Sequence, residues 1–273
     1  MAENQSITRP GEMSAVSGFG KTLAIITGAS KGFGRALALS IAPRLAAGSA
    51  LILAARSDDK LQELKAELSR SESGLTVRCV AADLRCQAGV DRVITEIRDI
   101  DPDIDHLLLF NNAASLGDVS RYCRDFTNVD EVNLYLSLNV SSALCLTAGV
   151  LRTVPRRASL RRVIVNVSSL CALQPFPSWV LYCSGKAARD MMFRVLAEEE
   201  PDLRVLNYAP GPLDTDMQLQ ARSSSADDAL RNSFSVMHTQ GQLLTCDQSI
   251  SKLMKVLVED KYPSGAHLDF YDL

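Results

Sequence analysis

The feature that most constrains the fold of this chain is an apolar strand that runs through a glycine-rich loop into a helix. Residues 23–26 are apolar, residues 27–34 read Thr-Gly-Ala-Ser-Lys-Gly-Phe-Gly, and a helical pattern begins at residue 35. Such a unit lets backbone N–H groups and a helix N-terminus meet a pyrophosphate. The spacing is G-x-x-x-G-x-G, not the commoner G-x-G-x-x-G, and the glycines alone could form a simple tight turn. Their place between strand and helix favours nucleotide binding.

Strand-like and helix-like segments alternate along the rest of the chain. Further strands are expected at residues 50–55, 76–80, 106–110, 163–167, 203–207 and 265–270, and helices at 58–69, 89–98, 129–151 (one long helix), after Tyr182, and 249–259. Alternation of this kind implies a parallel sheet covered on both faces. We predict an α/β fold with a single Rossmann-type, doubly wound, parallel seven-stranded sheet and helices on both faces.

Composition supports one domain and excludes several kinds of site. With 273 residues, 47% of them hydrophobic, the chain can bury one large core. We expect that domain over residues 21–273, behind a polar, disordered tail over residues 1–20. A net charge of −3 gives no general attraction to nucleic acid or anionic membranes, and no apolar run approaches the roughly 18 residues of a membrane span. Seven scattered cysteines fit reduced thiols in the cytosol, and with no C-x-x-C pair we expect no metal site.

A tyrosine and a lysine four residues apart carry the predicted chemistry. Tyr182 and Lys186 would share one helix face, and Ser169 ends the apolar strand that precedes them. A phenol with a pKa of about 10 must drop by roughly three units, or about 4 kcal/mol, to act near pH 7. One positive charge about 4 Å away, at an effective dielectric of about 20, supplies roughly that much. We therefore predict that Lys186 tunes Tyr182 as a proton donor, the alternative being an ordinary pair on a helix surface.

Two bases point to the kind of nucleotide. Arg56 follows the second strand, where an acidic residue usually meets a free ribose 2′-hydroxyl, and Lys31 lies in the glycine loop. A solvated arginine at a strand end would explain Arg56 alone. Two bases at one corner favour NADP(H) over NAD(H).

Together these pieces resemble the short-chain dehydrogenase/reductase family over residues 21–269. They are T-G-A-S-K-G-F-G, N-N-A after the fourth strand, a helical Asn139, Ser169, Y-x-x-x-K and P-G, with Ala114 replacing the family's usual glycine after N-N-A. The resemblance implies that Ser169, Tyr182, Lys186 and Asn139 are catalytic, with Asn139 holding a water in a proton relay. The cofactor residues it implies are Gly28, Ser30, Lys31, Gly32, Phe33, Gly34, Arg56, Ser57, Asp83, Leu84, Asn112, Tyr182, Lys186, Leu213, Thr215, Asp216 and Met217.

Long runs resemble a branch of the family that reduces pterins, among them residues 168–176, 181–191, 204–218 and 264–272. The resemblance implies an NADPH-dependent, homodimeric, cytosolic enzyme that reduces side-chain ketones of a pterin. The substrate residues it implies are Ser169, Cys171, Trp179, Tyr182, Gly211, Met217 and Asp269, with the Asp269 carboxylate accepting both donors of the pterin ring. A polar segment over residues 218–228 would act as a mobile lid.

Two other functions remain open at this point. One is a general carbonyl reductase of the same fold, acting on small diketones, quinones or steroids, which a turnover panel would distinguish. The other is a non-enzymatic NADP-binding protein, since a fold does not fix a function. Retention of Ser169, Tyr182 and Lys186 favours an enzyme.

Overall fold

A computed structural model describes residues 18–71, 74–100 and 103–273. Its strands are β1 (Thr22–Thr27), β2 (Ala50–Ala55), β3 (Thr76–Ala81), β4 (His106–Asn111), β5 (Arg161–Val167), β6 (Leu203–Ala209) and β7 (Ala266–Asp269). Its α-helices are α1 (Gly32–Ile41), α2 (Asp58–Ser71), α3 (Gln87–Arg98), α4 (Val129–Leu136), α5 (Ser142–Thr153), α6 (Val180–Glu199), α7 (Asp216–Ser224), α8 (Asp228–Thr239) and α9 (Cys246–Glu259).

The strands form one parallel sheet of seven in the order β3-β2-β1-β4-β5-β6-β7, which confirms the predicted fold. The strand order reverses direction between β1 and β4. In open sheets of this kind ligands bind outside the carboxyl ends of the strands at such a switch point. The fold therefore places a site beside the loops that follow β1 and β4.

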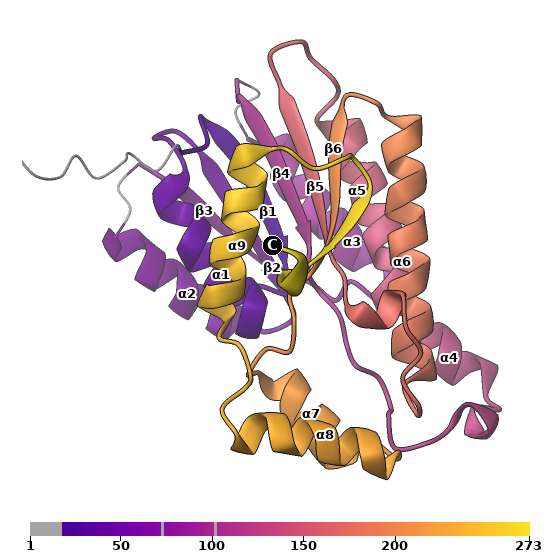
Figure 1. Ribbon diagram of the computed structural model, residues 1–273. Coiled ribbons are helices and arrows are strands. Elements are labelled where there is room, and N and C mark those ends of the chain that lie inside the picture. Colours follow the sequence, from indigo (N-terminus) through magenta and orange to yellow (C-terminus); the bar gives the residue numbers. More distant parts are fainter. Residues whose placement is uncertain (1–17, 72–73, 101–102) are drawn as a thin grey trace, which may run out of the picture.

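Two apolar layers hold helices to the faces of the sheet (Figure 1). Side chains that alternate along β1 divide between them: Ala24 and Ile26 pack with α1, α2 and α9, whereas Leu23 and Ile25 pack with α3, α5 and α6. The strands β1 and β2 are buried at every position, as expected for strands covered on both faces. Burial on both sides explains why their sequences read as unbroken apolar runs.

The expected long helix over residues 129–151 contains an interruption. A π-helical segment, Ser137–Ser141, separates α4 from α5, and Asn139 lies within it. The Asn139 amide donates to the carbonyl of Tyr135 at 3.0 Å and its Oδ1 accepts from the Ser115 N–H at 2.8 Å. Single π turns inside α-helices are frequent at functional sites.

The same helical run, Val129–Thr153, is long and apolar enough to cross a membrane by length and composition alone. Several of its polar side chains are buried inside the protein, where the amide of Asn111 on β4 donates to the hydroxyl of Thr147 at 2.9 Å. Only 33% of its most apolar window is buried inside the protein, so packing on the sheet accounts for part of its apolar character.

Two other expectations differ from the structure. The segment over residues 218–228, expected as a mobile loop, is largely helical, because α7 and α8 occupy most of it and lie beneath the carboxyl edge of the sheet (Figure 1). The tail expected over residues 1–20 falls mostly outside the described residues. Within them, Phe19 is buried and its N–H donates to the carbonyl of Arg44 at 2.8 Å, so ordered packing begins before residue 21.

Candidate active site

A cleft of about 660 Å³ runs along the carboxyl edge of the sheet at the switch point. The glycine loop forms one end, the residues after β2 and β3 form a second wall, and Tyr182 and Lys186 lie on its far side. Every residue predicted to contact the cofactor lines this one cleft: Gly28, Ser30, Lys31, Gly32, Phe33, Gly34, Arg56, Ser57, Asp83, Leu84, Asn112, Tyr182, Lys186, Leu213, Thr215, Asp216 and Met217.

The glycine loop is shaped by close backbone approach. Gly28 has φ +68°, a left-handed conformation that side chains disfavour. A Cβ on Gly34 would lie 2.4 Å from the carbonyl oxygen of Gly28 and 2.5 Å from the amide nitrogen of Asn112. Asn112 itself donates to the carbonyl of Thr27 at 2.8 Å, which ties the end of β4 to the loop. The loop thus forms a tight cradle at the start of α1, the shape that a pyrophosphate needs.

Basic and acidic side chains surround the opening of the cleft. Arg56 is exposed, and Lys60 also lines the cleft from the first turn of α2. Lys31 is engaged differently from the prediction, because its ammonium pairs with Asp216 at 2.7 Å and so joins the glycine loop to α7. Sequence reasoning missed Lys60, although its place four residues after Arg56 is a usable signal.

The catalytic residues converge where β5 ends and α6 begins. Tyr182 and Lys186 are both buried on α6. The Lys186 ammonium donates to the carbonyl of Val167 at 2.6 Å, and it lies 5.5 Å from the centre of the Tyr182 ring. Ser169 accepts a hydrogen bond from the N–H of Cys171 at 3.2 Å, and its hydroxyl also contacts the Tyr182 phenol.

The electrostatics of this pair correct the prediction made from the sequence. Burial raises the pKa of the Tyr182 phenol, while a hydrogen bond with Ser169 and the charge of Arg189 only partly oppose it. Burial, followed by the charge of Arg189, lowers the pKa of Lys186 to about 7. Burial destabilises the charged form of Lys186 itself. Lys186 therefore does not bring the pKa of Tyr182 below its usual value when no cofactor is bound.

Asn139 lies behind this pair, on the side of α6 where Gly185 allows close approach. A Cβ on Gly185 would lie 3.2 Å from the Tyr135 ring and 3.7 Å from the Cβ of Asn139. Both ends of the Asn139 amide bond within its own helical run and to Ser115, as described above. The structure gives this side chain a role in shaping the backbone next to Lys186.

Of the residues predicted to bind substrate, three belong to one apolar cluster. Cys171, Trp179 and Tyr182 pack together, with Met217 against them. Trp179 stacks on Phe176 and on Phe234 of α8, with ring centroids 5.7 and 5.2 Å apart, and its indole N–H donates to Ser225 at 2.9 Å. With its ring held by two phenylalanines and only 5% of the residue exposed, Trp179 supports the wall of the site from behind.

Of the residues predicted to bind substrate, Tyr182 and Met217 line the cleft, whereas Ser169, Cys171, Trp179, Gly211 and Asp269 are not among its lining residues. Asp269 ends β7, opposite Ala209 of β6, and therefore sits at the same edge of the sheet as Ser169. The Asp269 carboxylate accepts from the N–H of Tyr271 at 3.0 Å. Gly211 has φ +75°, and a Cβ added to it would lie 3.5 Å from the Cβ of Phe270.

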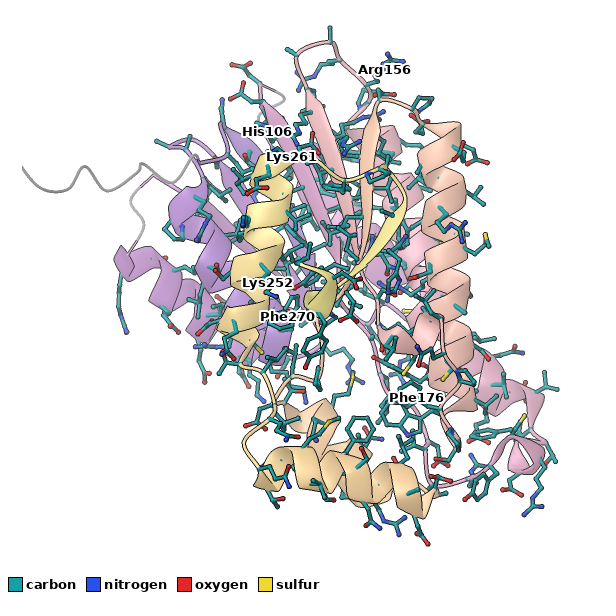
Figure 2. The ribbon with its side chains drawn as sticks, in the orientation of Figure 1. His106, Arg156, Phe176, Lys252, Lys261 and Phe270 are labelled. Atoms are coloured by element: carbon teal, nitrogen blue, oxygen red, sulfur yellow. The ribbon has the colours of Figure 1, made fainter. Side chains whose placement is uncertain are left out.

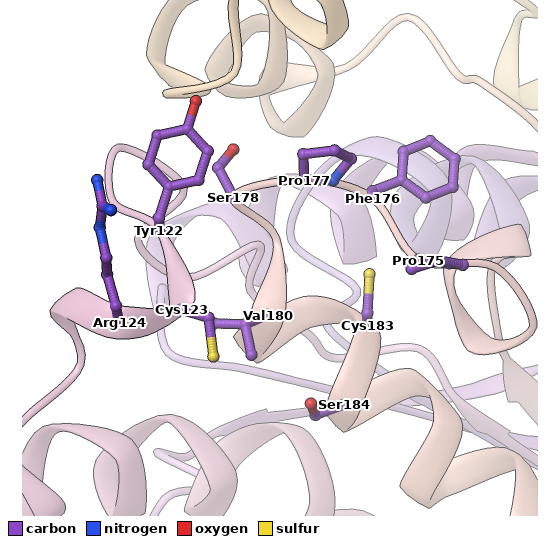
Figure 3. Close-up of a pocket in the computed structure, with 10 residues that line it drawn as sticks. All are labelled: Tyr122, Cys123, Arg124, Pro175, Phe176, Pro177, Ser178, Val180, Cys183 and Ser184. Atoms are coloured by element: carbon purple, nitrogen blue, oxygen red, sulfur yellow. The ribbon is translucent and has the colours of Figure 1, made fainter.

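A second hollow, of about 670 Å³, lies on the outer side of the segment that leads into α6 (Figure 3). Tyr122, Cys123 and Arg124 form one wall, and the segment from Pro175 to Ser184 forms the other. Figure 3 shows the sulfur of Cys183 pointing into it. It holds none of the predicted catalytic residues. No cluster of His, Cys, Asp or Glu suited to a metal ion occurs among the described residues.

Comparison with known proteins assigns a family. The model of the short chain dehydrogenase family matches residues 22–226. Sepiapterin reductase of Bos taurus is 49% identical over 264 residues, covering 96% of this chain and 99% of its own. Sepiapterin reductase of Xenopus tropicalis is 51% identical over 261 residues, covering 95% and 100%.

Solved structures agree with this assignment. The KRED1-Pglu enzyme superposes with a TM-score of 0.78 at 30% identity, covering 90% of this chain and 100% of its own. L-sorbose reductase from Gluconobacter frateurii, crystallised with NADPH and L-sorbose, superposes with a TM-score of 0.76 at 25% identity, covering 93% and 97%.

The lowered pKa of Lys186 predicts a pH dependence of stability that Lys186→Met should remove. The folded-state pKa of about 7 lies below the unfolded value of about 10.4, so the unfolded chain binds more protons between them. Stability of the wild type should therefore rise with pH above about 7, by up to about 1.4 kcal/mol per pH unit relative to the variant. Urea unfolding of both proteins, without cofactor, at about pH 7 and about pH 8.5 measures this difference. If the difference in unfolding free energy between wild type and variant were the same at both pH values, Lys186 would have an ordinary pKa.

Proposed function

We propose, from the premise that this chain belongs to the short-chain dehydrogenase family, that it reduces side-chain ketones of pterins with NADPH. The substrates are sepiapterin and 6-pyruvoyl-tetrahydropterin, in the last steps of tetrahydrobiopterin synthesis. The observation that carries the proposal is that Tyr182 and Lys186 line the far side of the cleft, with the Ser169 hydroxyl in contact with the Tyr182 phenol. The choice of pterin follows from the similarity to sepiapterin reductases, which are 49% and 51% identical over 96% and 95% of this chain.

The residues around the cleft fit the cofactor. The glycine loop at the start of α1 would hold the pyrophosphate, and Arg56 with Lys60 would face the 2′-phosphate of NADPH. Both bases line the cleft beside the end of β2. NADPH, when bound, supplies the hydride.

Side chains of the protein then supply the proton and stabilise the negative charge that develops on the ketone oxygen. Tyr182, kept protonated at neutral pH by its raised pKa, donates its proton to the oxygen of the reduced ketone as general acid. The Ser169 hydroxyl donates a hydrogen bond to that oxygen as its negative charge grows. Lys186 orients the nicotinamide ribose, and Asn139 holds a water in the relay behind it.

The function is tested directly by mixing the purified chain with NADPH and sepiapterin and following the absorbance of each. Tyr182→Phe should keep the ring packing and NADPH binding, yet lower turnover by at least the roughly 10²–10⁴-fold that general acid catalysis supplies. Tyr262→Phe is the matched control, because this tyrosine is also buried but is not among the described residues that line the cleft. A Tyr182→Phe protein that retains most of its activity would assign the proton to another donor.

Asp269 separates a pterin reductase from a general carbonyl reductase. Its carboxylate would accept both ring donors of a pterin, which leaves the side-chain ketone directed toward Tyr182. Asp269→Asn retains an oxygen to cap the N–H of Tyr271 but loses the charge. We expect kcat/KM for sepiapterin to fall more than a hundredfold, about 3 kcal/mol, while a small diketone is reduced as before.

Steady-state assays of both substrates, with Asp272→Asn as the control for a charge lost nearby, measure this effect. Asp272 caps the N–H of Asp269 at 2.9 Å from the exposed side of the same turn. Equal losses on the two substrates would assign Asp269 to support of the fold and would favour the general carbonyl reductase.

The protein is also proposed to be a cytoplasmic homodimer. Exposed apolar side chains lie on the two helical runs beside the site: Val129 and Leu134 on α4, Leu144 on α5, and Met191 and Val195 on α6. Pairing of these helices with a second copy would bury them. Sedimentation equilibrium should give twice the chain mass, and Leu144→Glu with Val195→Glu should give one. A wild-type protein that sediments as a single chain would contradict the proposal.

A further inference from the structure

The loop that joins α5 to β5 carries an arrangement of charge that the reductase reaction does not use. Residues 155–162 read Pro-Arg-Arg-Ala-Ser-Leu-Arg-Arg, with four arginines and no acid. Ser159 is the only serine or threonine in the sequence that has arginines both two and three residues before it. Protein kinases that select basic substrates place carboxylates against arginines at those two positions, because guanidinium–carboxylate pairs are strong and directional.

The structure presents this serine to solvent. Ser159 is exposed, lies in a turn outside any helix or strand, and its hydroxyl takes part in none of the hydrogen bonds found within residues 18–71, 74–100 and 103–273. The loop projects from the amino edge of the sheet, where Arg156 is labelled in Figure 2. We propose that Ser159 is a phosphorylation site for a basophilic serine kinase.

Arg156 and Arg157 make only weak contacts with the rest of the protein, so a kinase can bind their side chains. Arg156 pairs with Asp202 only at 3.5 Å and its side chain is 72% exposed, a geometry in which ion pairs contribute little. Arg157 makes one long hydrogen bond, 3.4 Å, to the carbonyl of Ile104. The turn itself is closed by a backbone bond from the N–H of Leu160 to the carbonyl of Arg157, and Leu160 is buried. Local opening of this one turn frees residues 156–159 as an extended segment.

Ser225 also has an arginine three residues before it, but its hydroxyl is not accessible to a kinase. Ser225 follows Arg222, but it is 1% exposed. Its hydroxyl donates to the carbonyl of Ala221 at 2.7 Å and accepts from the Trp179 indole at 2.9 Å. Phosphorylation there would require this buried contact to break, whereas Ser159 loses no bond.

The transfer itself is balanced by ATP, the co-reactant of the kinase. The Ser159 oxygen attacks the γ-phosphorus of ATP, and the bond from that phosphorus to the β–γ bridging oxygen breaks. ADP leaves with that oxygen, and the hydroxyl proton passes to the catalytic aspartate of the kinase. The product adds a charge of about −1.5 to −2 among the arginines of residues 156–162, where opposite charge stabilises it.

This site lies far from the reaction centre. Ser159 precedes β5 and Ser169 follows it, so the seven residues of that strand separate them by roughly 20 Å. The proposal is therefore independent of the ketone chemistry, and failure of either leaves the other standing.

The experiment treats the native full-length chain with the catalytic subunit of the cyclic-AMP-dependent protein kinase, Mg²⁺ and ATP. Intact mass and peptide mapping should find one phosphate, located on Ser159. Ser159→Ala should remove this phosphate. The matched control is Ser223→Ala, at an exposed serine that directly follows Arg222, and this variant should still be phosphorylated. Arg156→Gln combined with Arg157→Gln should slow phosphorylation at least tenfold.

Unfolding midpoints of all variants establish that each is folded. Phosphate that persists at the same rate in Ser159→Ala overturns the assignment. So does a kinase that modifies the urea-denatured chain at Ser159 but leaves the native chain unmodified, since the folded loop would then hide the site.

Discussion

Two buried charged neighbours on α6, Arg189 and Asp190, tie the reaction centre together. The Arg189 guanidinium donates to the carbonyls of Asn111 and Ala113 at the end of β4 and, at 2.8 Å, to the side chain of Asn166 on β5. Asp190 accepts from Asn166 and from Ser168, and it pairs with His267 of β7. Buried charges are tolerated only when their hydrogen bonds are filled in this way, and removing one partner leaves the other uncompensated.

The position of this pair explains why Tyr182 and Lys186 point where they do. Residue 186 follows residue 182 by four positions and precedes residues 189 and 190 by three and four, so the four share one side of α6. Bonds to β4, β5 and β7 fix that face against the carboxyl edge of the sheet. The same burial has an electrostatic consequence: the charge of Arg189 lowers the pKa of both Lys186 and Tyr182, although burial outweighs it at the tyrosine. The pKa of the proton donor Tyr182 is thus affected by Arg189, which is not among the residues that line the cleft.

Sequence patterns predicted the parts of this protein that depend on neighbours along the chain. All seven strands were located; β1 and β2, buried at every position, read as unbroken apolar runs, whereas the edge strands β3 and β7 are only partly buried. The cofactor residues line one cleft because they follow strands that end at one edge. The π segment around Asn139, the stack of Trp179 on Phe234 and the Asp190–His267 contact were not predicted. The two side-chain contacts join residues that are far apart in the sequence, and the π segment places Asn139 against Ser115, a partner 24 residues away. A polar residue in a helix gives no sign of which distant partner it will meet.

The substrate side is assembled from segments that the sheet does not itself constrain. Trp179 at the start of α6 is clamped by Phe176 and by Phe234 of α8, and the Lys31–Asp216 pair links the glycine loop to α7. The aromatic contacts are buried and dispersive, whereas the ion pair is exposed and weak. The aromatic stack anchors the α7–α8 unit to the catalytic helix, and Gln220 of α7 also donates to the carbonyl of Gly117 at 2.8 Å, whereas the link to the glycine loop is a contact that solvent reaches. Of these contacts the exposed Lys31–Asp216 pair costs least to break, and both of its residues line the cleft.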